Sequence, residues 1–402
     1  MSLRLVIAAS AVIALLGSCS ATGTSATSSA NIVAGPTDDE SATTLPTTTT
    51  TTVPPAPSTI FPSTTETPSS SGEIATFIEQ LAAEGGFSGA ALIGHEDEVV
   101  WQYASGPADR EQNLSNQVDT KFNLGSMNKM FTAVAVLQLM ERGELALDDT
   151  VADLFPRYPN PDVAAQVTVH QLLTHTSGLG DTFTPVFGED PNRYRSNADY
   201  LPLFVDAPLL FDPGESFSYS NAGYVVLGLI IEELSGRDYY DYVRDQIFLP
   251  AGMADTDSYA LDECVANLAM GYTSRDIDGN DTGVLTANAP LMPGRGFAAG
   301  GGYSTTEDMF RFRNALLGHE LLTAESTNML FDAQAEVAPG FEYGYGFMIR
   351  EEEGSIGHSG GAPGICSFFS MYPDSGYTLI VLSNSDEDCL AVLRHVQENP
   401  LG

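Results

Sequence analysis

The chain has 402 residues, 43% of them hydrophobic, which is enough for one large domain or two fused lobes. Its 53 acidic and 16 basic residues give a formal charge of −37, so it lacks the basic surface that nucleic-acid binding needs and disfavours strongly anionic partners. This acidic balance is typical of a solubility or salt adaptation and gives no information about the fold.

The first residues have the pattern of a targeting segment. Arg4 precedes an apolar run, residues 5–16, that is interrupted only by Ser10 and is too short to cross a bilayer as a helix. The run ends in Leu16-Gly17-Ser18-Cys19, which resembles the box at which bacterial lipoproteins are cleaved and lipidated. We therefore predict a lipoprotein-type signal peptide over residues 1–19, with Cys19 lipidated as the first mature residue. The alternative is an ordinary signal peptide cleaved after small residues.

A long segment of low complexity follows. Residues 20–72 are mostly Ser, Thr, Pro, Gly and Ala, and residues 47–52 are six consecutive threonines. A segment with so few large apolar side chains cannot bury a core, so we predict a disordered linker. The folded domain would then span residues 73–402. It would be exported and held by the lipid anchor and the linker at the extracytoplasmic side of the cell membrane.

The periodicity of the remaining chain predicts a sheet built from both chain ends. Helical patterns cover residues 74–83, 126–143, 222–234 and 390–397. Strand patterns cover residues 87–93, 98–103, 346–350, 364–372 and 377–383. The middle of the chain is mostly helical with long loops. This order predicts an α/β fold in which helices flank an antiparallel sheet and a mostly helical region is inserted between its two halves.

Cysteine and histidine spacing bears on disulfides and metals. Three cysteines follow the linker, Cys264, Cys366 and Cys389, and an odd number allows at most one disulfide among them. Cys366 and Cys389 lie at the edges of one predicted hairpin and are the expected pair. No Cys-x-x-Cys spacing is present, and His170 and His175 do not form a His-Glu-x-x-His zinc motif. We therefore expect no metal or other cofactor, and we interpret His175 as a hydrogen-bonded structural residue.

One of the two lysines in the chain, Lys129, lies in an almost wholly apolar stretch. Ser126 precedes it by three residues, so a helix there places both side chains on one face. A helix that is apolar nearly all round is buried, and a buried ammonium is costly unless it is paired or its pKa is lowered. A Ser-x-x-Lys pair is one way to activate a serine nucleophile. At a helix N-terminus, free N–H groups would also favour a developing oxyanion.

Two further segments carry polar groups beside apolar elements. Tyr219 and Asn221 lie just before the buried helix, where the plainer interpretation is a packing tyrosine and a helix cap. The run Gly357-His358-Ser359-Gly360-Gly361 precedes a predicted strand, and its small residues would let a substrate approach the backbone. This run also matches Gly-x-Ser-x-Gly, the nucleophile elbow of α/β-hydrolases with Ser359 as nucleophile, but the helix that such an elbow needs does not follow.

In this order the three segments resemble the serine β-lactamase and D-alanyl-D-alanine carboxypeptidase superfamily, and most strongly its class C-like branch with the family VIII esterases. Longer runs carry the same resemblance. They are residues 167–179 (Val-Thr-Val-His-Gln-Leu-Leu-Thr-His-Thr-Ser-Gly-Leu), 219–224 (Tyr-Ser-Asn-Ala-Gly-Tyr) and 299–305 (Ala-Gly-Gly-Gly-Tyr-Ser-Thr). The resemblance extends from about Gly72 to the C-terminus and implies the fold of that superfamily.

The resemblance also implies roles for individual residues. Ser126 would attack a carbonyl and become acylated, while Lys129 and Tyr219 would share the proton transfers. Asn221 would hold a substrate amide. The backbone N–H groups of Ser126 and Gly361 would form the oxyanion hole.

His358, Ser359 and Gly360 match the family's Lys-Thr/Ser-Gly triplet, which contacts the substrate. β-Lactamases usually carry a lysine where this chain has His358, and that lysine helps to bind a substrate carboxylate. The departure favours a peptidase or an esterase over a β-lactamase. Because Lys129 would share the pocket, we expect His358 to be a neutral hydrogen-bond partner whose protonation would reduce activity on acidification.

These patterns together predict a monomeric serine hydrolase that acts through a Ser126 acyl-enzyme on an amide or ester in a small molecule or peptide. A D-alanyl-D-alanine carboxypeptidase-like or esterase-like activity is the first expectation, and a β-lactamase is the alternative enzyme. From another class, the domain would be a non-catalytic module that binds peptidoglycan or a peptide. A binding module has no need of a buried lysine, which argues for the enzyme.

Overall fold

The computed structural model of the protein describes residues 58–60 and 70–401. Its largest element is a nine-stranded antiparallel sheet in the order β1-β3-β2-β15-β14-β13-β12-β11-β10. The strands are β1 (Ser58–Ile60), β2 (Gly89–His95), β3 (Glu98–Ser105), β10 (Ala335–Ala338), β11 (Phe341–Tyr343), β12 (Met348–Arg350), β13 (Ser355–Ala362), β14 (Ile365–Tyr372) and β15 (Tyr377–Ser383). The C-terminal β15 pairs with the N-terminal β2, which confirms the prediction of a sheet built from both chain ends.

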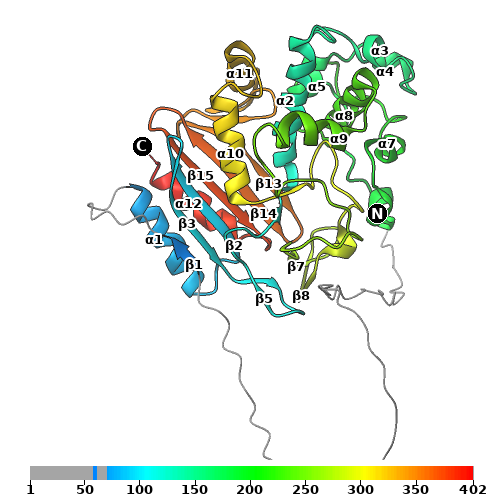
Figure 1. Cartoon of the computed structure of the whole chain (residues 1–402). Coiled ribbons are helices and arrows are strands. Elements are labelled where there is room, and N and C mark those ends of the chain that lie inside the picture. Colours follow the sequence, from blue (N-terminus) through cyan, green and yellow to red (C-terminus); the bar gives the residue numbers. More distant parts are fainter. Residues whose placement is uncertain (1–57, 61–69, 402) are drawn as a thin grey trace, which may run out of the picture. The chain divides into compact units, whose positions relative to one another are not determined.

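Helices cover both faces of this sheet (Figure 1). α1 (Ser70–Ala83) and α12 (Asp388–Glu398) pack on one face, and α2 (Asn128–Glu141) and α10 (Thr306–Leu317) pack against the other. Alternate residues of β15 join the two cores: Ile380 and Leu382 pack with α2 and α10, whereas Leu379 and Val381 pack with α1 and α12. A strand that is covered on both faces is expected to be apolar at successive positions, as Leu379–Leu382 of β15 are.

The inserted region between β3 and β10 is mostly helical, as predicted. Its helices are α2, α3 (Val151–Leu154), α4 (Pro161–Ala164), α5 (Val169–Leu173), α6 (Pro185–Glu189), α7 (Asn197–Tyr200), α8 (Asn221–Ser235), α9 (Tyr239–Val243), α10 and α11 (Ala324–Phe331). Short 3-10 or π turns are η1 (Gly125–Met127), η2 (Pro191–Arg193), η3 (Leu201–Leu203), η4 (Arg244–Phe248) and η5 (Ala289–Leu291). Three small ladders join β4 (Pro107–Asp109) to β5 (Leu114–Ser115), β6 (Phe122–Asn123) to β9 (Tyr303–Ser304), and β7 (Tyr272–Arg275) to β8 (Asp281–Ala287).

Two predicted boundaries differ from the structure. Within the segment predicted to be a linker, β1 pairs with β3 and α1 begins at Ser70. Edge pairing uses backbone hydrogen bonds, so it does not require the apolar side chains by which the segment was judged. The rest of the predicted linker and the predicted signal peptide lie outside the described residues. The run Gly357–Gly361 lies inside β13 rather than before a strand. The sequence did not predict this strand because glycines replace the β-branched residues that usually mark one.

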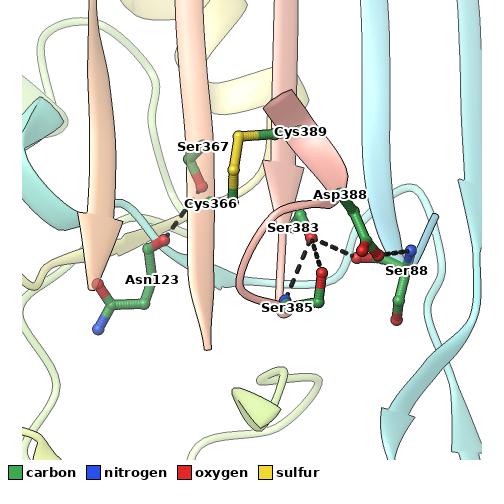
Figure 2. Close-up of a disulfide and its surroundings, with 8 residues drawn as sticks. All are labelled: Ser88, Asn123, Cys366, Ser367, Ser383, Ser385, Asp388 and Cys389. Atoms are coloured by element: carbon green, nitrogen blue, oxygen red, sulfur yellow. Dashed lines mark hydrogen bonds between the residues drawn. A yellow bond between two sulfur atoms is a disulfide. The ribbon is translucent and has the colours of Figure 1, made fainter. Parts of the chain in front are cut away.

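The predicted disulfide between Cys366 and Cys389 is present (Figure 2). It joins β14 to the first turn of α12. The neighbouring Asp388 accepts a hydrogen bond of 2.7 Å from the backbone N–H of Ser88, just before β2. These two links attach the closing helix to the centre of the sheet.

We expect the Cys366→Ala/Cys389→Ala double variant to lose about 3 kcal/mol of unfolding free energy, because the bond closes a loop with a sequence separation of 23. Denaturant titration of the oxidised wild type and the variant measures this loss. Two equal denaturation midpoints would contradict the expectation.

Candidate active site

Ser126 lies in η1, the short turn that leads directly into the buried helix α2, as the sequence indicated. Gly125 has a φ of +52°, and a Cβ there would lie 2.8 Å from the backbone nitrogen of Gly361. Gly360 faces the same turn, because a Cβ on it would lie 1.9 Å from the carbonyl oxygen of Leu124. Only glycine at these two positions allows the backbone of η1, which carries Ser126, to approach the backbone of β13 so closely.

Lys129 is fully buried one turn further along, and its three hydrogen bonds define the site. Its Nζ lies 3.3 Å from Ser126 Oγ, 2.7 Å from Asn221 Oδ1 and 2.6 Å from the carbonyl oxygen of Ala299. Desolvation lowers the pKa of Lys129 to about 7, although the carboxylate of Asp181 acts in the opposite direction. At neutral pH a large fraction of this side chain is therefore a free amine that can accept a proton.

Tyr219 packs over the same amine, with its ring centroid 4.7 Å from Lys129 Nζ. Burial raises the pKa of its phenol well above the ordinary value, and a hydrogen bond with Ser126 opposes that shift. The phenol therefore keeps its proton at neutral pH. Next to the serine, Tyr219 is suited to donate a proton, whereas Lys129 is the better base.

Asn221 is the first residue of α8, but it is not the cap of that helix. The cap is Ser220, whose hydroxyl accepts a hydrogen bond of 3.1 Å from the N–H of Gly223. The side chain of Asn221 is thereby free to accept from Lys129, while its Nδ2 donates to Asp181 Oδ1 at 2.9 Å. The helix-cap interpretation of Asn221 was wrong, and its amide links the lysine to a carboxylate.

His358 is buried on β13 and forms hydrogen bonds with both ring nitrogens. Nδ1 lies 2.6 Å from the carbonyl oxygen of Ser359, so it must carry the proton, and Nε2 accepts from the hydroxyl of Tyr343 at 3.0 Å. Desolvation and the nearby Lys129 lower the pKa of His358 to about 3. His358 is therefore neutral, as expected, and at this pKa its protonation would reduce activity only in strongly acidic solution.

Ser359 lies in the middle of β13, where its Oγ contacts Met348 Sδ at 3.8 Å. The next element is the strand β14, not a helix. A nucleophile elbow requires a sharp turn from a strand into a helix, so the α/β-hydrolase interpretation of this run is wrong.

A cavity of about 580 Å³ adjoins this part of β13. Ser359, Gly360 and Gly361 form part of its wall, which continues past the β7–β8 turn to the disulfide. Arg275 is the one basic residue that lines it, and this guanidinium forms an ion pair with Glu387. None of Ser126, Lys129 and Tyr219 lines this cavity, and its wall includes residues of the core on the α12 face of the sheet, so it is separate from the candidate catalytic residues.

His175 supports the site without reaching the nucleophile in any described contact. It is buried, its Nδ1 accepts a hydrogen bond of 3.0 Å from the N–H of Ser220, and its ring packs 4.3 Å from the ring of Tyr219. This agrees with the structural role that the sequence suggested.

Sequence reasoning missed three partners in the site: Asp181, the carbonyl of Ala299 and Tyr343. Asp181 follows the family-like run that ends at Leu179, and Ala299 begins another such run, so both had a positional signal. A backbone acceptor has no side-chain signature, and no motif marked Tyr343. These partners were therefore visible only once the segments were brought together.

Known proteins share this arrangement of elements. The Beta-lactamase family model matches residues 74–396. A penicillin-binding protein of Bacillus subtilis (strain 168) is 33% identical over 331 residues, which is 78% of this chain and 71% of that protein. The crystal structure of a penicillin-binding protein from Bacillus halodurans matches with 33% identity and a TM-score of 0.73, over 79% of this chain and 98% of that one.

A D-stereospecific amidohydrolase from Streptomyces sp. also matches, with 25% identity and a TM-score of 0.66 over 80% of this chain and 97% of that one. The family match covers nearly the whole described domain and includes every site residue discussed above. The chain therefore belongs to the β-lactamase family, and it is a serine hydrolase of the superfamily that contains the β-lactamases and penicillin-binding proteins.

Proposed function

We propose that this protein hydrolyses an amide or ester through an acyl-enzyme on Ser126, and that its preferred leaving group carries no negative charge. One observation carries the proposal: a fully buried lysine amine, with a pKa lowered to about 7, lies 3.3 Å from the serine hydroxyl. That geometry is suited to general-base activation of a nucleophile.

In the first step Lys129 accepts the Ser126 proton while Oγ forms a bond to the substrate carbonyl carbon. The electron pair of the carbonyl moves to its oxygen, which the N–H groups of Ser126 and Gly361 would bind. The close contact between η1 and β13 supports this oxyanion hole, since the glycines there hold the two backbones together.

Collapse of the intermediate breaks the C–N or C–O bond. Tyr219 gives its phenolic proton to the departing nitrogen or oxygen, and the ammonium of Lys129 returns a proton to Tyr219. Water then attacks the acyl-enzyme and the same groups move protons in the reverse direction. The raised pKa of Tyr219 and the lowered pKa of Lys129 support this division of roles.

The electrostatics of the site support an uncharged leaving group. The lysine that β-lactamases usually carry at this position would present a positive charge, whereas His358 is buried and neutral. A carboxylate next to the scissile bond would be desolvated without a counter-ion, which costs binding energy. This favours an amidase or esterase over a carboxypeptidase, and the amide chemistry in the name of the Streptomyces relative agrees with that preference.

A matched pair of substrates tests this proposal. An N-acetylated peptide ending in D-Ala-D-Ala differs from its C-terminal amide only in the terminal charge, and nitrocefin probes β-lactam turnover. We expect kcat/KM to be at least about tenfold higher for the amide, a difference of roughly 1.4 kcal/mol. A preference for the free acid would support the carboxypeptidase, and rapid nitrocefin hydrolysis would support the β-lactamase.

The place of action is a further part of this proposal. The pattern of residues 1–19 supports export and a lipid anchor on Cys19, and the monomeric state is likewise a prediction. Across residues 58–60 and 70–401, no helix has the length and apolarity needed to span a membrane. We expect Cys19→Ser to move the protein from the membrane fraction to the soluble fraction. Recovery of this variant in salt-washed membranes would contradict the lipid anchor.

A further inference from the structure

Asp181 lies at the open side of the site, and the reaction proposed above does not use its carboxylate. The side chain is exposed, yet it is held in place by neutral donors. Its Oδ1 accepts from the backbone N–H of Thr182 at 2.6 Å and of Phe183 at 3.2 Å, and from Asn221 Nδ2 at 2.9 Å. The carboxylate therefore has a defined position beside Asn221.

A single amide connects this carboxylate to the base. Asn221 accepts from Lys129 through Oδ1 and donates to Asp181 through Nδ2, and Lys129 contacts the nucleophile Ser126. Asp181 is thus close enough to Lys129 and Tyr219 to act on both electrostatically. The contacts Ser126–Lys129–Asn221–Asp181 thus place an exposed carboxylate one amide away from the base that serves the nucleophile.

The charge of Asp181 is not neutralised by a direct ion pair. No lysine, arginine or histidine nitrogen in the described part of the chain lies within 4.0 Å of its carboxylate oxygens. His175 and His358 are buried and neutral, and Tyr219 keeps its proton. Lys129, with its pKa lowered to about 7, is cationic in only part of the molecules at neutral pH, so the charge of Asp181 exceeds the positive charge beside it, in keeping with a cationic ligand.

We infer that Asp181 binds a protonated primary amine on the acyl part of the substrate, so that the substrate class is amides or esters of amino acids with a free amino group. This inference rests on the function proposed above and names its substrate. The acyl part is favoured over the leaving group for an electrostatic reason. Lys129 becomes an ammonium as the bond to Ser126 forms, and it would repel a cation on a group leaving past Tyr219.

Two substrates of nearly equal shape test the charge contact. Alanine p-nitroanilide and isobutyric acid p-nitroanilide differ in an ammonium group against a methyl group, and both alanine enantiomers are assayed. We expect the kcat/KM of the wild type to be about tenfold higher for the better alanine enantiomer than for the isobutyric acid substrate, which is the size of one modest charge contact. Added salt should reduce this ratio, because the carboxylate is exposed.

The Asp181→Asn variant keeps an acceptor for Asn221 and removes the charge. We expect its ratio of kcat/KM values for the two substrates to fall to about one, through a higher KM for the alanine substrate. Asp206→Asn is the matched control, since Asp206 is exposed and its loss changes the net charge equally. This control should retain the wild-type ratio.

The outcomes separate the inference from the function on which it rests. If Asp181→Asn slowed both substrates equally, Asp181 would be a positioning residue for Asn221 and the ammonium site would be overturned. A wild type that treats both substrates alike would overturn it too. A fluorophosphonate carries no ammonium, so failure to label Ser126 with it would overturn the acyl-enzyme proposal instead.

Discussion

Replacing Ser126 by alanine will leave a folded protein that takes no covalent label from a fluorophosphonate or a fluorescent penicillin. The change removes only Oγ, whose described contacts are with Lys129 and Tyr219 inside the site. The core around α2 is untouched, so the melting temperature should change by only a few degrees. Intact-mass spectrometry after incubation with the label measures the adduct directly.

The matched control for this experiment is Ser359→Ala. Ser359 lies on β13 next to His358, and the hydrogen-bond partner described for its hydroxyl is Met348 Sδ. This variant should be labelled, with slower turnover of substrate. An adduct on Ser126→Ala, or loss of the adduct in Ser359→Ala alone, would mean that Ser126 is not the nucleophile.

Lys129→Arg will lower the rate of acylation by about 10²- to 10⁴-fold, the usual contribution of a general base. Arginine keeps a positive charge near Ser126, but it cannot release its proton at any working pH. Stopped-flow measurement of label incorporation gives this rate. Near-normal acylation in Lys129→Arg would show that Lys129 supplies only a charge.

The same base determines the pH profile. Only the free amine of Lys129 can accept the serine proton, so acylation of the wild type should rise with pH through about 7 and then level off. With a pKa of about 3, His358 should not contribute to this limb. A His358→Gln variant should therefore keep the midpoint of the profile, and a midpoint that moved by more than one pH unit would contradict the assignment.

Burial of Lys129 also predicts how stability depends on pH. The pKa is 10.5 in the unfolded chain and about 7 in the folded protein, so between these values the unfolded state binds the extra proton. Stability relative to Lys129→Met should therefore rise with pH by up to about 1.4 kcal/mol per pH unit above 7. Denaturant titrations at several pH values from 6 to 9 measure this. A difference in unfolding free energy between the two proteins that stays constant over this range would contradict the prediction.

The elements that were predicted correctly contain long, nearly continuous apolar runs. The helix after Ser126, the buried helix before Gly236 and the strand at residues 377–383 appear where their patterns placed them. The Ser126–Lys129 pairing was also predictable, since three residues along a helix determine which side chains are neighbours. These features depend on local sequence alone.

The features that were missed depend on contacts between distant segments. In β13, Gly360 lies against η1 and Gly357 lies against the backbone of Phe369, so neither position can carry the side chain by which a strand is recognised. Folding brings the hydroxyl of Tyr343 to His358, and it brings the carbonyl of Ala299 to Lys129 from a segment far away in the sequence. Asn221 was interpreted as a helix cap because asparagine favours that position, whereas the cap is the preceding residue, Ser220.

The position of β15 between β2 and β14 has a consequence for how the protein is made. Synthesis proceeds from the N-terminus, so β2 and β3 emerge long before the strand that covers their inner edge. The sheet cannot close until β15 has left the ribosome, and pairing between strands so distant in sequence is slow. A chain that stops before Tyr377 would leave an apolar strand edge unpaired and would aggregate rather than persist as a partly active enzyme.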